Sequence, residues 1–266
     1  MTLKKLFFLF LSQLIFINFS AFSQTLTRIK KEGELRVCTS AGYAPFEVKS
    51  SSGEWVGFDI KMFELFSKVL NVKLNMLDIR WEGVFPALLA MKCDFITGGM
   101  SVTKEREKVI NFSDPIYKSG NSLVVSMKAK DKYKVLSDLD KVGVKIAVKT
   151  GNTADFFLKK VLKHAKILRF DTNADLITAV LENRTDAFAQ DSIFSMMASS
   201  EHKGKLYILK DKLNYEDLAV GIRKKDTALL KEFNNFLGEW KKNGGYDKAV
   251  HYYLESDDWR AELKHE

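Results

Sequence analysis

The sequence predicts an α/β protein of two βαβαβ lobes joined by two crossing strands. Two observations support this fold class: strands and helices alternate twice along the 266 residues, and each series is followed by an extended run without a helix of its own. Alternating strands and helices favour mostly parallel sheets covered by helices. A chain that crosses twice between two such units is typical of a bilobal protein with a hinge.

The first series predicts three strands and two helices. The strands are the segments Leu35–Thr39, Val72–Leu77 and Asp94–Thr97. Apolar residues at helical spacing predict a helix from Phe58 to Leu70. A shorter helix is predicted around Val84 to Leu89, with a proline near its first turn, where the missing N–H is tolerated.

The second series repeats this order. Its strands are predicted at Lys145–Val148, Ile167–Phe170 and Asp186–Ala189, and its helices at Thr153–Leu162 and Asn173–Leu181. We therefore expect a second sheet of the same kind.

The two crossings are predicted near residues 122–126 and 218–222, where extended runs lie between polar residues. Two helices follow, at Thr227–Lys242 and Tyr246–Leu254, and glycines separate them in a C-cap position. The chain would thus start and finish in the same lobe. The predicted division is 24–121 with 219–266 for lobe 1, and 122–218 for lobe 2.

Residues 1–23 are predicted to be a signal peptide, because Lys4 and Lys5 precede an apolar stretch that ends in small residues at Ala21-Phe22-Ser23. The alternative is an uncleaved membrane anchor, which normally needs about 20 apolar residues. Polar residues interrupt the stretch at Ser12, Gln13 and Asn18. No cysteine lies just past the cleavage point, so we expect no lipid anchor. Export to the periplasm is the predicted localisation.

The formal net charge of +8 does not indicate nucleic-acid binding, because lysines alternate with acids and no basic run is interleaved with stacking aromatics. The four histidines show no ligand spacing with the cysteines, so no metal and no cofactor is expected. Export would allow a disulfide between Cys38 and Cys93. However, Cys38 lies late in its predicted strand and Cys93 just before another, so in parallel neighbouring strands the two sulfurs would lie at different heights. Two buried free thiols are therefore predicted. The protein is expected to be a monomer.

The strongest candidate for a binding residue is Arg106, which follows a short apolar strand and two glycines. Ligands of open α/β sheets lie outside the carboxyl ends of the strands. A guanidinium there fits a carboxylate through paired donors, and Ser101 and Thr103 add hydroxyls. The alternative is a helix-capping turn with a surface arginine.

Two more polar residues end strands in the second series. Asp191 could accept hydrogen bonds from an ammonium group or cap the helix that starts at Ser192. Thr153 lies at a helix N-terminus, where free amides attract anions, or serves only in capping. Since Arg106 and Asp191 belong to different predicted lobes, one zwitterionic ligand that contacts both would favour lobe closure.

Two aromatic residues, Tyr43 and Trp81, are candidates to sandwich the ligand side chain, with a cation–π contribution if that side chain is basic. The alternative for Trp81 is that it only covers the edge of the sheet.

These motifs, in this order, resemble the family 3 periplasmic solute-binding proteins of polar amino-acid ABC transporters. The resemblance runs from Gly33 to Leu254. The segments that carry it are Gly42-Tyr43-Ala44-Pro45-Phe46, Gly57-Phe58-Asp59, Trp81 to Pro86, Ser101 to Arg106, Phe112-Ser113-Asp114-Pro115, Gly151-Asn152-Thr153 and Asp191.

The resemblance implies a periplasmic-binding-protein type II fold, an amino-acid ligand and a membrane permease as partner. It implies that Arg106 clamps the ligand carboxylate, aided by groups at Gly99, Ser101 and Thr153. Asp191 would take the ammonium, and Tyr43 and Trp81 would flank the side chain.

A second resemblance leads to an enzyme. Leu35 to Thr39, Lys92-Cys93-Asp94 and Gly98 to Thr103 are similar to the periplasmic cyclohexadienyl dehydratases, which act on prephenate or arogenate on the same fold. Their glutamate general acid follows the aspartate that matches Asp191. No acid occurs from Ser192 to Met196, so a receptor is preferred and the dehydratase is the alternative.

The identity of the ligand stays open between a basic and a polar amino acid. Ser40 and Ala41 stand where binders of lysine and arginine often carry an acid. Other acids could serve a basic side chain, namely Glu47, Glu82 and Asp155. Lys149 resembles the glutamine binders instead.

Overall fold

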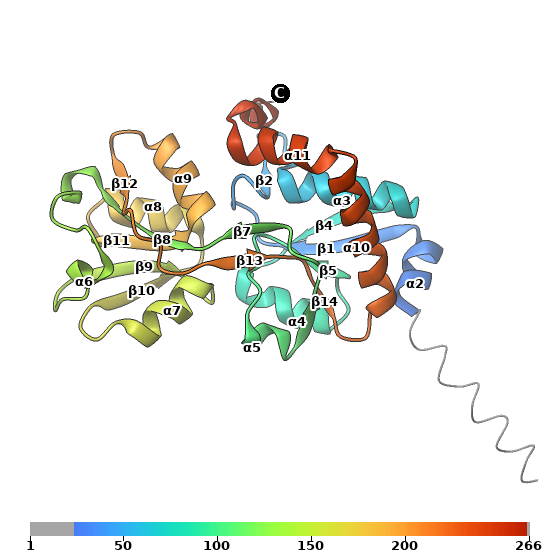
Figure 1. The fold of residues 1–266 in the computed structure, drawn as a ribbon, viewed down its shortest axis with the longest axis horizontal. Helices are drawn as coiled ribbons and strands as arrows, with labels where there is room; N and C mark the ends of the chain where they lie inside the picture. Colours follow the sequence, from blue (N-terminus) through green and yellow to red (C-terminus); the bar gives the residue numbers. More distant parts are fainter. Residues whose placement is uncertain (1–23, 265–266) are drawn as a thin grey trace, which may run out of the picture.

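The computed structural model describes residues 24–264 and contains two five-stranded sheets (Figure 1). The first has the order β4-β1-β5-β14-β6 and the second β10-β9-β11-β8-β12. In each sheet the first three strands pair in parallel, and the fourth, β14 or β8, pairs antiparallel with both of its neighbours, so four strands share one direction and one runs opposite. The two sheets therefore share one plan, and the predicted two-lobed α/β fold is confirmed.

Helices cover both sheets, and the last helices return to the first sheet (Figure 1). The first sheet comprises β1 (Glu34–Thr39), β4 (Lys73–Asp78), β5 (Phe95–Ile96), β6 (Ile110–Phe112) and β14 (Gly221–Arg223). Its helices and small strands are α2 (Gln24–Glu32), β2 (Val48–Lys49), β3 (Trp55–Val56), α3 (Phe58–Leu70), α4 (Val84–Leu89), α5 (Lys104–Glu107), α10 (Thr227–Lys242) and α11 (Gly245–Ala249). Short helical turns lie at Trp81–Gly83, Val250–Glu255 and Asp258–Lys264.

The second sheet comprises β8 (Asn121–Ser126), β9 (Lys145–Lys149), β10 (Lys166–Phe170), β11 (Ala187–Asp191) and β12 (Leu206–Ile208). Its helices are α6 (Leu136–Leu139), α7 (Thr153–Val161), α8 (Asn173–Leu181) and α9 (Ser192–Glu201), and one helical turn lies at Met127–Ala129.

A phenylalanine cluster forms the core of the first lobe. Phe95 of β5 lies 5.4 Å from Phe63 and 5.2 Å from Phe233, measured between ring centroids. These rings come from the strand and from the apolar stripes of α3 and α10, and all three are fully buried. Burial of one such ring stabilises the fold by about 1.5–3 kcal/mol. The apolar residues that recur at helical spacing in α3 and α10 therefore form the faces with which these helices pack on the sheet.

The two sheets are linked by a short antiparallel pair, β7 (Tyr117–Ser119) and β13 (Glu216–Leu218) (Figure 1). The segments 122–126 and 218–222, where the crossings were predicted, lie mostly within the sheets, as parts of β8 and β14. Their apolar character comes from burial in a sheet, whereas the linking pair is short and partly polar. The lobe boundaries given above stay a prediction.

The prediction of two free thiols is wrong, because Cys38 and Cys93 form a disulfide with their Cα atoms 5.7 Å apart. Cys93 lies before β5, as predicted, but the loop that carries it reaches β1. In this loop Asp94 N–H donates to the carbonyl of Arg36 at 2.7 Å, which holds the loop against β1. Both cysteines belong to one buried cluster with Trp81.

The predicted signal peptide, residues 1–23, lies outside the described residues. Within residues 24–264, no helix has the length and apolar character that a membrane crossing would require.

Candidate functional site

A pocket lies between the two lobes, where the strands β1, β5, β9 and β11 end. The empty space in the pocket and at its open mouth is about 400 Å³. All seven residues predicted to bind ligand line it. The full lining is Ser40, Tyr43, Glu47, Trp81, Gly98, Gly99, Ser101, Arg106, Asn121, Lys149, Asn152, Thr153, Gln190 and Asp191.

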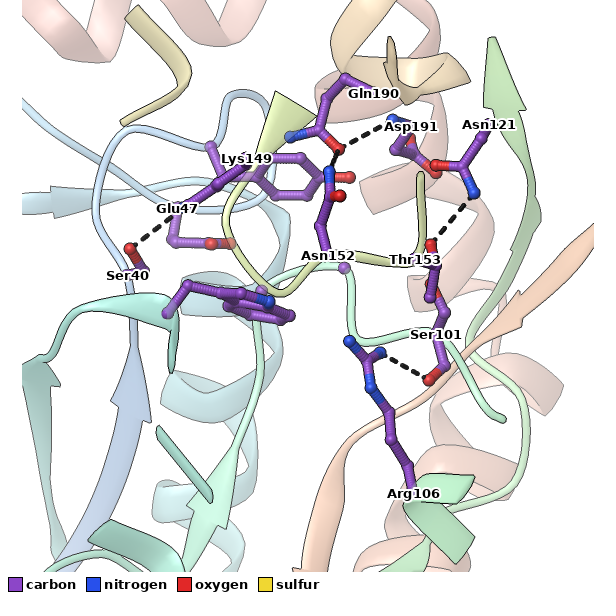
Figure 2. Close-up of a pocket in the computed structure, with 14 residues that line it drawn as sticks. Ser40, Glu47, Ser101, Arg106, Asn121, Lys149, Asn152, Thr153, Gln190 and Asp191 are labelled. Atoms are coloured by element: carbon purple, nitrogen blue, oxygen red, sulfur yellow. Dashed lines mark hydrogen bonds between the residues drawn. The ribbon is translucent and has the colours of Figure 1, made fainter. Parts of the chain in front are cut away.

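Figure 2 shows two groups of labelled side chains on opposite sides of this pocket. We call Ser101, Arg106, Thr153 and Asp191 the arginine end. We call Ser40, Glu47 and Lys149 the lysine end.

Arg106 lies in the four-residue helix α5 and is only 9% exposed. The capping turn of the alternative is present, because the Thr103 hydroxyl accepts from Arg106 N–H at 3.2 Å, but the arginine does not lie at the surface: its guanidinium turns into the pocket. Nη1 donates to the Ser101 carbonyl at 2.9 Å, and within residues 24–264 the group has no ion pair. Burial lowers its pKa to about 10. Arg106 is thus a buried cation that an anion would stabilise.

Asp191 ends β11 and also caps α9, because its Oδ1 accepts from Ile193 N–H at 2.8 Å. Its Oδ2 accepts from the Ser119 hydroxyl, and the Tyr43 hydroxyl is a further partner. Burial raises the pKa of the carboxyl, and these hydrogen bonds oppose that shift. A buried carboxylate that lines the pocket can accept from a ligand ammonium.

Thr153 opens α7, but the cap of this helix is Asn152, whose side chain accepts from Asp155 N–H at 2.8 Å. The Thr153 hydroxyl instead donates to Glu216 at 2.8 Å and accepts from Asn121 at 3.0 Å. Glu216 belongs to β13, so Thr153 connects the pocket with the strand pair that links the lobes.

Tyr43 and Trp81 form apolar walls. The Tyr43 ring stacks on Phe194 at 5.9 Å and packs so tightly on Gly99 that a Cβ there would lie 2.4 Å from the ring. Trp81 packs in the buried cluster of the disulfide and also lines the pocket, and the guanidinium of Arg106 lies 5.7 Å from its ring. The sheet-covering role and the pocket role of Trp81 therefore coexist.

Glu47 and Lys149 are almost completely buried at the lysine end, with 1% and 5% exposure. Lys149 Nζ donates to the Ser40 hydroxyl at 3.2 Å. Burial raises the pKa of Glu47 well above its usual range and lowers that of Lys149, and the opposite charge of each partner opposes these shifts. Despite this attraction the two groups form no ion pair, and Glu47 Oε2 has no hydrogen-bond partner among residues 24–264.

Direct contacts between the lobes close this pocket. Lys149 of the second lobe reaches Ser40, and Trp81 Nε1 donates to the Gly151 carbonyl at 3.4 Å. At the surface, Arg80 and Asp171 form an ion pair at 3.3 Å. The two lobes are therefore in direct contact beside the pocket.

Several residues that line the pocket were not predicted from the sequence to bind ligand. Asn121 lies opposite Asp191 in the register of β8 and β11, and only this pairing brings it to the pocket. Gln190 and Asn152 bond to each other at 2.9 Å, and both adjoin residues that the sequence singled out. Of the acids considered for a basic side chain, only Glu47 lines the pocket; Asp155 pairs with Arg169 at 2.7 Å, and Glu82 is exposed.

No group of three or more His, Cys, Asp and Glu side chains within residues 24–264 is arranged to hold a metal ion. The pocket combines two buried cations, buried carboxyls and aromatic walls. Two lobes that enclose such a pocket define a class of proteins that bind small polar molecules between domains.

The family model of the bacterial extracellular solute-binding proteins, family 3, matches residues 35–256, and the chain belongs to this family. A probable histidine-binding protein of Neisseria gonorrhoeae is 32% identical over 231 residues, which cover 85% of each chain. The lysine/arginine/ornithine-binding periplasmic protein of Escherichia coli is 30% identical, over 83% of this chain and 87% of the relative. Both the predicted family and the predicted fold are confirmed.

An enzyme also occurs among the relatives. The cyclohexadienyl dehydratase of Pseudomonas aeruginosa is 27% identical over 177 residues, which cover 66% of each chain. Among solved structures, the ancestral amino acid-binding protein AncCDT-1, a precursor of cyclohexadienyl dehydratase, has a TM-score of 0.83. It is 37% identical and covers 86% of this chain and 99% of its own.

Proposed function

We propose that this protein is an exported receptor that captures an amino acid between its lobes and delivers it to the permease of an ABC transporter. The observation that carries the proposal is that the buried Arg106 forms no ion pair within residues 24–264 and shares its pocket with the buried Asp191. A zwitterion would supply an opposite charge to each. The names of the relatives, which refer to histidine and to lysine, arginine and ornithine, support an amino acid as ligand.

Arg106 holds the carboxylate of the ligand, aided by groups at Gly99, Ser101 and Thr153. Asp191 accepts from the ammonium, and Tyr43 and Trp81 flank the side chain. Arg106 belongs to the first lobe and Asp191 to the second, so only the closed arrangement satisfies both ligand groups. Binding therefore shifts the population toward closure. Residues 1–23 direct export to the periplasm, where the receptor acts as a monomer.

Calorimetry with the twenty amino acids, on the purified mature chain, tests this function. At least one amino acid should bind, and small-angle scattering should then show a smaller radius of gyration than without ligand. Absence of binding by all twenty, or unchanged open dimensions at saturation, would contradict the receptor.

One observation favours the dehydratase as a second candidate: Glu47 is a buried carboxyl that lines the pocket, and burial raises its pKa, as for the carboxyls that serve as general acids. Phe194, however, occupies the first turn after Asp191, where the resemblance expects the acid, and its ring stacks on Tyr43. Incubation with prephenate and detection of phenylpyruvate separates the two functions. If the protein is a receptor, no phenylpyruvate should form.

A further inference from the structure

Exposed lysines gather at the end of the second lobe that lies opposite the pocket. The pocket lies where β9 and β11 end, whereas this region comprises the loops before β9 and β10 and the last turn of α7. Its first loop follows α6, which lies far from the linking strands β7 and β13 in Figure 1. We call this region the basic tip. Its exposed lysines are Lys141, Lys145, Lys159, Lys160, Lys163 and Lys166.

Backbone contacts hold the two loops of the basic tip together. Lys145 and Lys166 are register partners at the starts of the parallel strands β9 and β10. The Asp140 carboxylate accepts from the backbone N–H groups of residues 163–165 at distances between 2.7 and 3.1 Å. Lysines that are separate in the sequence therefore share one surface.

The lysines of the basic tip form no ion pairs within residues 24–264. The acids beside them are bound by other groups of the protein. Asp140 is held by the three backbone N–H groups, which lower its pKa to about 2. Asp186 accepts from the Tyr133 hydroxyl at 2.8 Å and from Lys145 N–H at 2.9 Å, and Asp138 accepts from two backbone N–H groups. The surface is therefore cationic, and its ammonium groups are free to meet an external anion.

Two apolar side chains are exposed among these lysines. Val142, in the loop before β9, is 86% exposed, and Val161, after Lys160, is 39% exposed. Basic side chains around exposed apolar ones are typical of surfaces that lie on an anionic lipid interface. The cations meet the headgroups there, and the apolar groups enter the boundary with the acyl chains.

We infer that the basic tip binds the surface of a bilayer that contains anionic lipids, with its lysines at the phosphates and Val142 at the acyl boundary. A nucleic acid fits this surface less well, because the exposed apolar group between the lysines of the two loops is a valine and not an aromatic ring that stacks on bases. The pocket lies at the other end of the strands and stays accessible. The inference goes beyond the proposed receptor function, because it concerns where the protein lies and not what it captures.

Co-sedimentation with lipid vesicles tests the inference. The chain from Gln24 onward is used, because it contains both sheets with their helices and lacks the apolar residues 1–23, which would bind vesicles on their own. Vesicles of phosphatidylglycerol and phosphatidylcholine in equal parts should bind at least 10-fold more tightly than vesicles of phosphatidylcholine alone. Binding should fall steeply between about 50 and about 500 mM salt, because salt screens exposed charges. Equal binding to both kinds of vesicle, or binding that salt does not change, would overturn the inference.

A triple variant locates the contact. Lys141→Gln, Lys163→Gln and Lys166→Gln together should weaken binding to the anionic vesicles at least 10-fold, because each lysine near such a surface contributes about fivefold. The control carries the same change at three exposed lysines of the first lobe, so that its net charge is identical, and it should bind normally. These are Lys68, Lys73 and Lys231. An equal loss in both triple variants would mean that only net charge matters, and would overturn the inference.

The apolar contact separates a lipid surface from a soluble polyanion. Val142→Ser should weaken binding to the anionic vesicles about threefold, and no loss would overturn the placement of this valine at the acyl boundary. Polyglutamate that binds as tightly as the vesicles at equal charge concentration would indicate an acidic protein as partner and overturn the inference. Circular dichroism and thermal unfolding establish that each variant is folded. Failure in these tests leaves the receptor function untouched, because calorimetry with amino acids measures that function separately.

Discussion

The arginine end and the lysine end of the pocket are both buried, yet they are built on opposite electrostatic principles. At the arginine end, a cation and a carboxylate from different lobes each face the pocket without pairing with each other. At the lysine end, the cation and the carboxyl attract each other directly. The two ends therefore present different chemistry to a bound molecule: opposite charges that are not paired with each other at the first, and a mutually attracting cation and carboxyl at the second.

Removal of the cation at the arginine end should have the largest effect. Arg106→Ala should lower amino-acid affinity 30-fold or more, because loss of the charged partner of a buried carboxylate costs about 2–5 kcal/mol. Calorimetry measures the change. Lys104→Ala, at the exposed start of the same short helix, is the control and should bind normally. Unchanged affinity in Arg106→Ala would contradict the proposed role of Arg106 in holding the carboxylate of the ligand.

The buried Asp59, which lies behind the turn of Gly98 and Gly99 at the pocket, should make stability depend on pH. Asp59 accepts from Thr97 and Gly98 and so holds the turn that contains Gly98 and Gly99. Burial raises its pKa to about 6. Because the folded state then binds the proton more tightly than the unfolded state, this group's contribution to stability falls as pH rises from about 4 to about 6.

Comparison of the wild type with Asp59→Asn isolates that contribution. The difference between their free energies of unfolding should shift by about 3 kcal/mol against the wild type over this interval, at about 1.4 kcal/mol per pKa unit. Urea unfolding at pH 4, 5 and 6 (about the expected window) measures it. Parallel pH profiles for the two proteins would exclude a buried, titrating Asp59.

The carboxylate of the arginine end should give the next effect. Asp191→Asn keeps an oxygen that can cap α9, since asparagine is as good an N-cap as aspartate, but it removes the charge that meets the ligand ammonium. Affinity should fall about 10- to 100-fold, as for a hydrogen bond to a charged group. The melting temperature without ligand should hardly change. A large loss of stability with unaltered affinity would make Asp191 a capping residue alone.

The smallest effect is expected from a new acid at Phe194, beside the ring of Tyr43. Phe194→Glu should add at most feeble formation of phenylpyruvate from prephenate, because a general acid contributes about 10²–10⁴-fold only when it is correctly placed. The wild type should form none. Spectrophotometric detection of phenylpyruvate distinguishes the outcomes, and a wild-type turnover of roughly 1 per second or faster would establish an enzyme.

The bounds of several helices and the polar residues at the ends of strands could be predicted from the sequence. The stripes of α8 and α10 give helices at Asn173–Leu181 and Thr227–Lys242, as predicted. Arg106 and Asp191 follow short apolar strands, and a strand that is buried on both faces must leave its polar residues at its end. Local periodicity and the position of polar residues after a strand therefore determined the fold class and the arginine end.

Contacts between distant segments were decided only by the tertiary structure. The disulfide depends on the loop that places Cys93 beside β1, and the position of Asn121 depends on its register with Asp191. The facing of Glu47 and Lys149 depends on how the two lobes close. Side-chain spacing along one segment carries no information about such approaches, because they result from packing that involves the whole chain. The sequence by itself thus determined the elements and the amino-acid-binding motif, and the tertiary structure decided which charged groups face each other inside the pocket.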